Sequence, residues 1–217
     1  MRISARPWRT PEPLTKYRSA TRPPPRRDRA PVGAPPAVPP IETFRTANGH
    51  ALRLRPIRPD DADALRRAFS RLTPEQVRLR LFHRVNELTR EAAEQMTTID
   101  PATTTAYVVV DADDEIRAEA RIHIDAVTDS AEFAVAVDPS FTNQGIGRRL
   151  MQRMVEDARR RGLYEMWGDV LAENHTMLDF VKKLGAERRA VPDEPGLTRV
   201  HFNLGKTSAT PAPEVTR

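Results

Sequence analysis

One short stretch, DPSFTNQGIGRRL over residues 138–150, decides the fold. It joins a predicted strand over 132–137 to a predicted helix of about 16 residues, through a loop that contains Gly145 and Gly147. From Leu150 onward the apolar residues recur at helical spacing, and Gly162 stands where a C-terminal cap is expected. A strand, a glycine loop and an amphipathic helix in this order predict an α/β unit with a ligand site at the start of the helix.

The start of this predicted helix suits an anion. The amides of a first helical turn lack intrahelical partners and carry partial positive charge. Gly145 and Gly147 let a phosphate approach the backbone, and Arg148 and Arg149 can add charge-assisted hydrogen bonds. The glycine spacing differs from the dinucleotide and nucleoside triphosphate motifs. A Gly-x-Gly before a helix is also common without any phosphate ligand, so the loop alone leaves both interpretations open.

The segments around this loop predict alternating strands and helices. Helices are expected from Pro59 to about Arg71, after Thr73 and after Thr89, with Thr73 as a cap. In the second of these, Arg78 and Arg80 are expected on a solvated face. Alternation of apolar and arginine residues predicts that the first strand is half exposed. The predicted strands cover residues 52–57, 104–110, 116–124, 132–137 and 165–172.

The glycine loop resembles the coenzyme A motif of the Gcn5-related N-acetyltransferase (GNAT) superfamily, Gln/Arg-x-x-Gly-x-Gly/Ala at a strand-to-helix junction. A second likeness follows in the strand over 165–172, Asn174, a helix and the KLGA sequence over 183–186. The resemblance implies an α/β (α+β) GNAT fold. Its central sheet would be mixed but mostly antiparallel, twisted, with six to seven strands flanked by helices and splayed at the acetyl-CoA site.

Within the superfamily the sequence is most similar to the acetyltransferase domain of bacterial protein lysine acetyltransferases. The matching pieces are LRPIRPDD over 54–61, LTPEQVRLRLF over 72–82 and AEFAV over 131–135. This resemblance implies transfer of an acetyl group from acetyl-CoA to a protein lysine, by direct attack in a ternary complex. The residues it implies for binding the cofactor are Val135, Ala136, Val137, Thr142, Asn143, Gln144, Gly145, Ile146, Gly147, Arg148, Arg149 and Asn174.

The sequence departs from the family pattern at three positions. Thr142 replaces the signature glutamine and Asn143 replaces a glycine of the usual loop. The tyrosine with which many relatives protonate the departing thiolate would fall at Val181. The grip on the diphosphate and the source of that proton are therefore open.

Glu132 is the candidate general base. Alternation in its strand places Phe133, Val135 and Val137 on one face, and Glu132 with Ala134 and Ala136 on the other. A carboxylate beside two small residues suits a shallow groove in which an amine loses a proton before it attacks a thioester. The resemblance implies the same role for a glutamate at this strand position. A solvated charge at the start of a strand is the alternative interpretation.

Composition separates a basic tail from a nearly neutral domain. Residues 1–40 contain eleven prolines, eight arginines and one lysine against two acidic residues, so this tail carries +7, whereas the whole chain carries +5 and residues 41–217 therefore carry −2. We expect residues 1–40 to be disordered, the acetyltransferase domain to cover 41–205, and 206–217 to be a flexible tail. Nucleic acid binding by the tail is considered but not favoured, because the tail has no recognisable nucleic-acid-binding fold.

Several classes of function are not expected. The chain has no cysteine, its five histidines lack metal-ligand spacing, and no run of about 18 apolar residues is present. We therefore expect no metal, no membrane span and a cytoplasmic location, with the protein as a monomer or homodimer. Two alternatives to a lysine acetyltransferase remain: an enzyme that acetylates a small amine such as a polyamine, and a domain that binds coenzyme A as a sensor or scaffold without catalysis.

Overall fold

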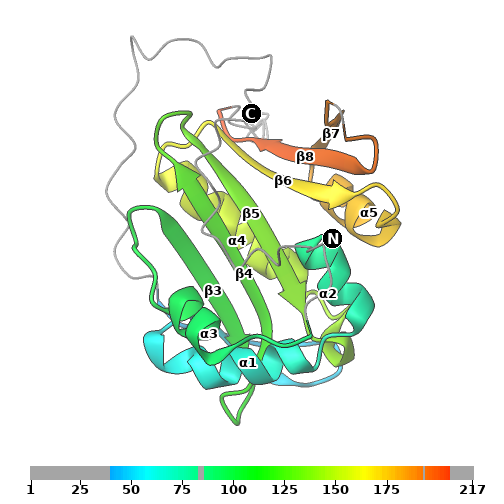
Figure 1. Ribbon diagram of the computed structural model, residues 1–217. Helices are drawn as coiled ribbons and strands as arrows, with labels where there is room; N and C mark the ends of the chain where they lie inside the picture. Colours follow the sequence, from blue (N-terminus) through cyan, green and yellow to red (C-terminus); the bar gives the residue numbers. More distant parts are fainter. Residues whose placement is uncertain (1–39, 83–85, 193, 206–217) are drawn as a thin grey trace, which may run out of the picture. The chain divides into compact units, whose positions relative to one another are not determined.

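The computed structural model describes residues 40–82, 86–192 and 194–205 (Figure 1). The chain divides into two units, Met1–Ala30 and Pro31–Arg217, and every described residue lies in the second unit. The predicted tails over 1–40 and 206–217, apart from Pro40, lie outside the described residues.

One mixed sheet of eight strands forms the centre of the second unit, in the order β1-β2-β3-β4-β5-β6-β8-β7. Every neighbouring pair is antiparallel except β5 and β6, which are parallel. The strands are β1 (Glu42–Arg45), β2 (Ala51–Pro56), β3 (Thr104–Val110), β4 (Ile116–Asp125), β5 (Ser130–Val137), β6 (Glu165–Leu171), β7 (Glu187–Ala190) and β8 (Leu197–Asn203).

The sheet thus has more strands than the six to seven expected. Both edge strands, β1 and β7, are only four residues long. All four residues of β7 are exposed, and three of them are charged, so β7 lacks the apolar alternation by which strands are predicted. Short, charged edge strands are also a common protection against pairing with other chains.

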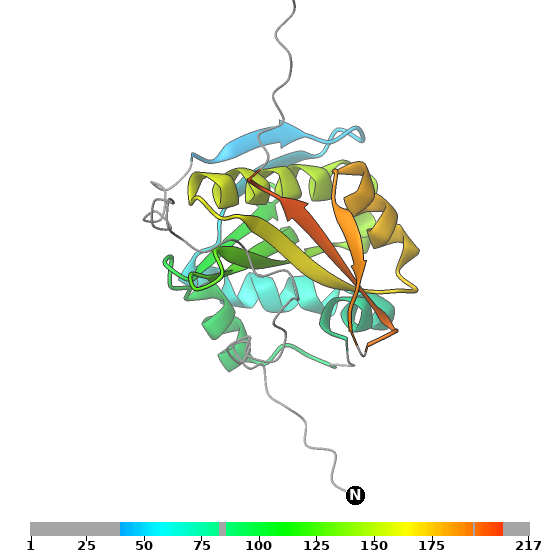
Figure 2. The ribbon, with the colours of Figure 1, turned by 90° about the horizontal axis from the view of Figure 1, so that it is seen from above.

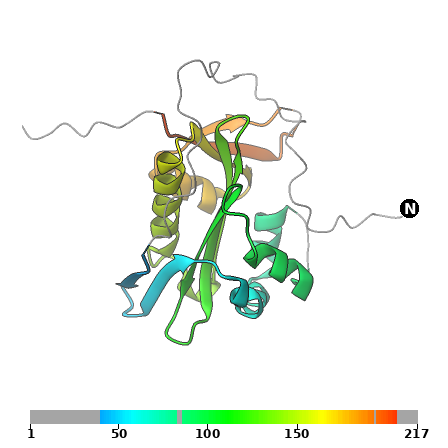
Figure 3. The same ribbon diagram turned by 90° about the vertical axis from the view of Figure 1, so that its left-hand side faces the viewer.

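The helices cover both faces of this sheet. α1 (Ala62–Ser70), α2 (Pro74–Leu81) and α3 (Arg90–Thr97) lie on one face, and α4 (Ile146–Arg160) lies on the other (Figures 2 and 3). α5 (His175–Lys183) follows β6, and short 3-10 turns cover Pro59–Asp61 and Pro139–Phe141. No described helix combines the length and apolar character that a membrane span requires.

The helix starts follow the predicted caps. Thr73 accepts a hydrogen bond from the Gln76 amide at 3.1 Å, and the Gln76 side chain accepts one from the Thr73 amide, which completes a capping box. Thr89 caps α3 in the same way through the amide of Ala92. The single helix expected from Pro59 to Arg71 is instead a 3-10 turn followed by α1.

One expectation for β2 is wrong. Arg55 is buried, because its guanidinium donates to both carboxylate oxygens of Asp61 at 2.7 Å. A bidentate partner of opposite charge offsets the cost of removing the guanidinium from water. The alternation of apolar and arginine residues in β2 therefore does not separate a buried face from a solvated one.

The predicted apolar stripe of α4 packs on the sheet. Leu150, Met151, Met154 and Ala158 are at most 1% exposed and belong to the main core cluster. In the same interface the hydroxyl of Tyr107, on β3, donates a short hydrogen bond to the fully buried Asp157 of α4. Burial raises the pKa of Tyr107 to about 12, so its hydroxyl keeps its proton at neutral pH. This pair fixes the body of α4 on the sheet.

β5 and β6 diverge after a short parallel contact (Figure 1). Their register ends at the pair Glu132 and Trp167, whereas β6 stays paired with β8 as far as Leu171. The rest of β5 therefore has no described neighbour on its β6 edge. The two strands form a splayed opening in the sheet, as the resemblance predicted.

Candidate functional site

Ion pairs and hydrogen bonds hold the start of the loop between β5 and α4 in place. Asp138 is buried and accepts hydrogen bonds from Arg71 Nε at 2.9 Å, Arg117 at 3.2 Å and the Ser140 amide at 3.0 Å. Phe141 is buried as well, with the Arg117 guanidinium 5.0 Å from its ring centroid. These contacts fix the start of the loop against α1 and β4.

The backbone beyond Phe141 turns through two left-handed residues before α4 begins. Asn143 has φ of 58° and Gly145 has φ of 82°, a region that glycine enters freely and asparagine tolerates better than most residues. Asn143, in the place of the family's glycine, therefore takes a conformation that a glycine there could also take. Thr142, in the place of the signature glutamine, directs its hydroxyl back to the Pro139 carbonyl at 2.9 Å.

The first turn of α4 is open to a ligand. Gly145 is the N-cap residue, and no side chain caps this end of the helix. At Gly147 a Cβ atom would lie 3.4 Å from the Phe180 ring, so a larger side chain would occupy the narrow space between α4 and α5. Uncapped amides with partial positive charge and a close backbone approach are what a diphosphate requires. The residues present therefore fit the diphosphate of coenzyme A.

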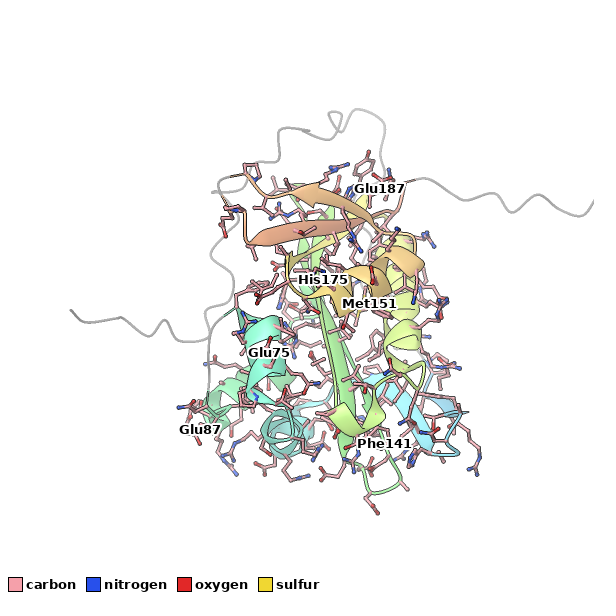
Figure 4. All side chains as sticks on the ribbon, turned by 90° about the vertical axis from the view of Figure 1, so that its right-hand side faces the viewer. Glu75, Glu87, Phe141, Met151, His175 and Glu187 are labelled. Carbon is pink, nitrogen blue, oxygen red and sulfur yellow. The ribbon has the colours of Figure 1, made fainter. Side chains whose placement is uncertain are left out.

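A pocket of about 640 Å³ extends from this helix start through the splayed opening. It touches residues of β5 that face α4 and residues that face α2, so it connects the two faces of the sheet. Figure 4 looks toward this region, with Glu75 on α2 and His175 on α5 on either side of β5 and Phe141 below. One end of the pocket is formed by the start of α4, and the other by α2 and the α2-facing side of β5.

Most of the residues expected at the site line this pocket. They are Glu132, Val135, Ala136, Val137, Thr142, Asn143, Gly145, Ile146, Gly147, Arg148 and Asn174. Asn174 also caps α5, because its side-chain oxygen accepts a hydrogen bond from the Met177 amide at 3.1 Å. The side-chain nitrogen of Asn174 remains the group with which this residue can approach a ligand in the pocket.

Two of the expected residues are not among those that line the pocket. Gln144 turns back and donates to the Ser140 carbonyl at 3.0 Å. Arg149 forms an ion pair with Glu42 and lies over the ring of Phe44, 4.4 Å from its centroid, so its charge is directed to β1. The reason is helical geometry, since Arg149 follows Arg148 by about 100° around the helix and faces away from the pocket.

Glu132 lies on the α2-facing side of β5, as the alternation predicted. Burial raises its pKa, the negative charge of Asp169 raises it further, and Arg199 and Arg80 lower it. A carboxylate with a raised pKa is better matched to proton transfer near neutral pH than an exposed one. The solvated charge at a strand start, which was the alternative interpretation, does not describe this side chain.

The α2 end of the pocket contains residues that the sequence did not point to. Arg80, expected on a solvated face, is 21% exposed in its side chain, lines the pocket and approaches Glu119 at 3.5 Å. Asp169 on β6 also lines the pocket. The one signal for it was a carboxylate between apolar residues in the middle of the strand. The further α2-side lining comes from Leu72, Gln76, Leu79 and Phe82.

The position of the missing tyrosine is part of the core. Val181 is fully buried and packs in the main core cluster, whereas its neighbour Phe180 lines the pocket. Among the described residues that line the pocket there is no tyrosine, serine or cysteine. Within the described part of the chain, no group of three His, Cys, Asp or Glu side chains is arranged to hold a metal ion.

A comparison with protein families matches residues 64–186 to the acetyltransferase (GNAT) family. The match spans α1 to the end of α5 and includes the glycine loop. The chain belongs to the GNAT family. It is therefore an N-acetyltransferase of the GNAT type, with acetyl-CoA as the acyl donor.

One curated relative and two solved structures illustrate what the chain is similar to. An acetyltransferase of Pseudomonas aeruginosa is 27% identical over 150 residues, which are 68% of this chain and 81% of that protein. The GNAT domain of S. lividans PAT has the same fold, with a TM-score of 0.69 at 23% identity over 75% of this chain and 96% of that domain. A spermidine N-acetyltransferase from Vibrio cholerae, solved with CoA and spermine, gives a TM-score of 0.60 at 17% identity over 71% and 96% of the two chains.

Proposed function

We propose that this GNAT enzyme acetylates lysine side chains of proteins, with Glu132 as the general base. One observation carries the proposal: the uncapped start of α4 and the half-buried carboxylate of Glu132 line the same pocket, at opposite ends of the splayed opening. A donor bound at the first and an amine brought to the second would meet along β5. The residues expected to hold the donor are those of the loop and β5 that line the pocket.

The proposed chemistry requires little from the protein beyond placement and one proton transfer. Acetyl-CoA supplies a thioester, whose acyl carbon accepts the nitrogen lone pair of the acceptor. Glu132 removes one proton from the ammonium group, and the freed lone pair forms the N–C bond while the electron pair of the broken C–S bond leaves on sulfur. The second proton, which the nitrogen loses as it becomes an amide, neutralises the departing thiolate. Peptide groups on the free edge of β5 can orient the donor, because within the described sheet they have no strand partner beyond Glu132.

Support for a lysine acceptor comes from α2. The segment over 72–82, which resembles the bacterial lysine acetyltransferases, forms the α2-side wall of the pocket through Leu72, Gln76, Leu79 and Arg80. The resemblance thus includes the wall that an acceptor would contact, and not the donor site alone. The solved structure with TM-score 0.69 is the GNAT domain of a protein named PAT. We further propose, from the sequence, a cytoplasmic location.

A small amine is the second candidate, and one contact favours it. Arg78 on α2 forms an ion pair with Glu173 in the turn before α5, which joins the two walls beside the pocket. Such a bridge restricts access for a folded protein more than for a polyamine. A solved GNAT structure with TM-score 0.60 is a spermidine acetyltransferase.

Incubation of the full chain with labelled acetyl-CoA tests the proposal. A bacterial lysate, a lysine-containing peptide and spermidine serve as parallel acceptors, and mass spectrometry locates the label. Label on protein and peptide lysines is the expected result, whereas label on spermidine alone would favour the small-amine enzyme. Calorimetric binding of coenzyme A without transfer to any of these acceptors would contradict catalysis and favour a sensor.

A further inference from the structure

Asp169 lies at the point where β5 and β6 part. Glu132 and Trp167 are the last paired residues of these strands, and paired residues of a sheet share a face. Asp169, two residues beyond Trp167, is on that same face and lines the pocket together with Glu132. Two carboxylates from diverging strands therefore meet at the α2 end of the pocket.

A neighbouring strand, β8, fixes the direction of the Asp169 carboxylate. Arg199, its partner on β8, donates from Nε and an NH2 group to the two oxygens, at 2.8 and 2.7 Å. The Arg199 guanidinium lies over the indole ring of Trp167, 4.1 Å from the centroid. Each carboxylate oxygen can accept more than one hydrogen bond, so Asp169 can still accept from a ligand in the pocket.

We propose that Asp169 positions the acceptor, by holding its ammonium group beside Glu132 at the point where the two strands part. This role presupposes the acetyl transfer proposed above, with Glu132 as the base. Asp169 binds and orients the nitrogen through a charge-assisted hydrogen bond, and Glu132 takes the proton. The two carboxylates thus have separate tasks, because Arg199 engages both oxygens of Asp169 whereas Glu132 has no such fork.

The charges on this face of the sheet are nearly balanced. Three arginines and three carboxylates face the Glu132 region from five elements, with one histidine beside them. When Glu132 accepts a proton the group gains positive charge, which favours departure of the proton once the amine has reacted. The groups concerned are Arg80 on α2, Glu119, Arg121 and His123 on β4, Glu132 on β5, Asp169 on β6 and Arg199 on β8.

Steady-state kinetics of Asp169→Asn with a lysine peptide test this role. The acceptor KM is expected to rise about tenfold, as for the loss of one charge-assisted hydrogen bond, with a smaller change in kcat. The dissociation constant for coenzyme A should stay unchanged, because Asp169 is not at the α4 end. Asp169→Glu, which keeps the charge, should restore part of the acceptor affinity.

The pH profile separates positioning from a purely structural role. The negative charge of Asp169 raises the pKa of Glu132 and the positive charge of Arg199 lowers it. Asp169→Asn should therefore move the acidic limb of kcat/KM to lower pH, and Arg199→Gln should move it to higher pH. If the Asp169–Arg199 pair only joined β6 to β8, both variants would have a lower melting temperature. Their acidic limbs would then not move in opposite directions.

The outcomes distinguish this inference from the function on which it rests. No transfer by the wild type to any amine would overturn both. Transfer by the wild type that is impaired in Glu132→Gln but unaltered in acceptor KM and pH profile in Asp169→Asn would overturn the positioning role alone. If Asp169→Asn does not fold, two other measurements decide: the acidic limb of kcat/KM in Arg199→Gln and the acceptor KM of Asp169→Glu. The positioning role would be overturned if that limb did not move to higher pH and that KM equalled the wild-type value.

Discussion

The two ends of the pocket differ in the groups that they offer to a ligand. At the α4 end the features that suit a ligand belong mainly to the backbone, with two left-handed residues, an uncapped helix turn and Gly147, and Arg148 is the charged side chain there. At the α2 end it is side chains, and three of them are charged: Arg80, Glu132 and Asp169. Single side-chain replacements should therefore act mainly on the reaction at the α2 end, whereas at the α4 end changes of backbone conformation should have the larger effect on donor binding.

The largest effect is expected from Glu132→Gln. The amide keeps the shape of the side chain but cannot accept the proton, so kcat/KM should fall about 10²- to 10⁴-fold, the usual contribution of a general base. The dissociation constant for coenzyme A should stay within about twofold, because the α4 end is untouched. Acetyl transfer to a lysine peptide and calorimetry measure the two quantities.

The matched control for this variant is Asp179→Asn. Asp179 is a carboxylate on α5 that is 68% exposed and pairs with Arg188 outside the pocket. Its replacement should leave both quantities unchanged. Equal rates for Glu132→Gln and the wild type would show that another group removes the proton, and the assignment of the base would then be wrong.

A smaller effect is expected from Gly145→Ala at the opposite end. Gly145 and Gly162 both have left-handed φ, 82° and 74°, and a Cβ at either would meet no atom within 4 Å. Alanine in this conformation costs about 1–2 kcal/mol at each site. Only Gly145 lies in the pocket, so only there should relief of the strain displace the first-turn amides, with an about tenfold weaker affinity for coenzyme A.

Gly162→Ala is the control for this effect, because it carries the same strain at the far end of α4. Both variants should lower the melting temperature by a similar amount. Equal loss of coenzyme A affinity in the two variants would mean that helix stability, rather than the backbone at Gly145, determines binding. The contrast between the two ends of the pocket would then not hold.

The same contrast explains what could be predicted from the sequence. The strand, the loop and α4 are contiguous in the sequence, and Gly145 and Gly147 indicated where a ligand can approach the backbone. The periodicity gave the individual strands, except for the short edge strands, and the arrangement of the sheet was implied by the family resemblance that this motif carries. Arg149 was expected at the site but pairs with Glu42 on β1, because motif spacing does not tell which side of a helix turn faces the pocket.

The α2 end could be predicted only in part. Glu132 was found from strand alternation, but Asp169 and Arg80 come from β6 and α2, far from it in sequence. Their proximity depends on the register of β5 with β6 and on how α2 packs across β5, neither of which leaves a local signal. The buried pair of Arg55 and Asp61 escaped for the same reason, since the partner of a buried charge cannot be read from its own strand.

The smallest effect is expected from Glu173→Gln, which removes the ion pair with Arg78 beside the pocket. The two side chains are 60% and 31% exposed, and exposed pairs contribute about 0–1 kcal/mol. If the bridge restricts access to the α2 end, its loss should lower the KM of a protein acceptor by at most about fivefold and leave that of spermidine unchanged.

The effect of Glu173→Gln should also shrink as salt rises, because exposed charges are screened. Arg188→Gln, which breaks an equally exposed pair with Asp179 away from the pocket, is the control. A rise in KM for both acceptors would instead make Glu173 part of the acceptor site. In that case Arg78 and Glu173 would belong to the acceptor site, and the α2 end of the pocket would have more charged side chains than its lining residues alone. The difference between the two ends of the pocket would then be larger.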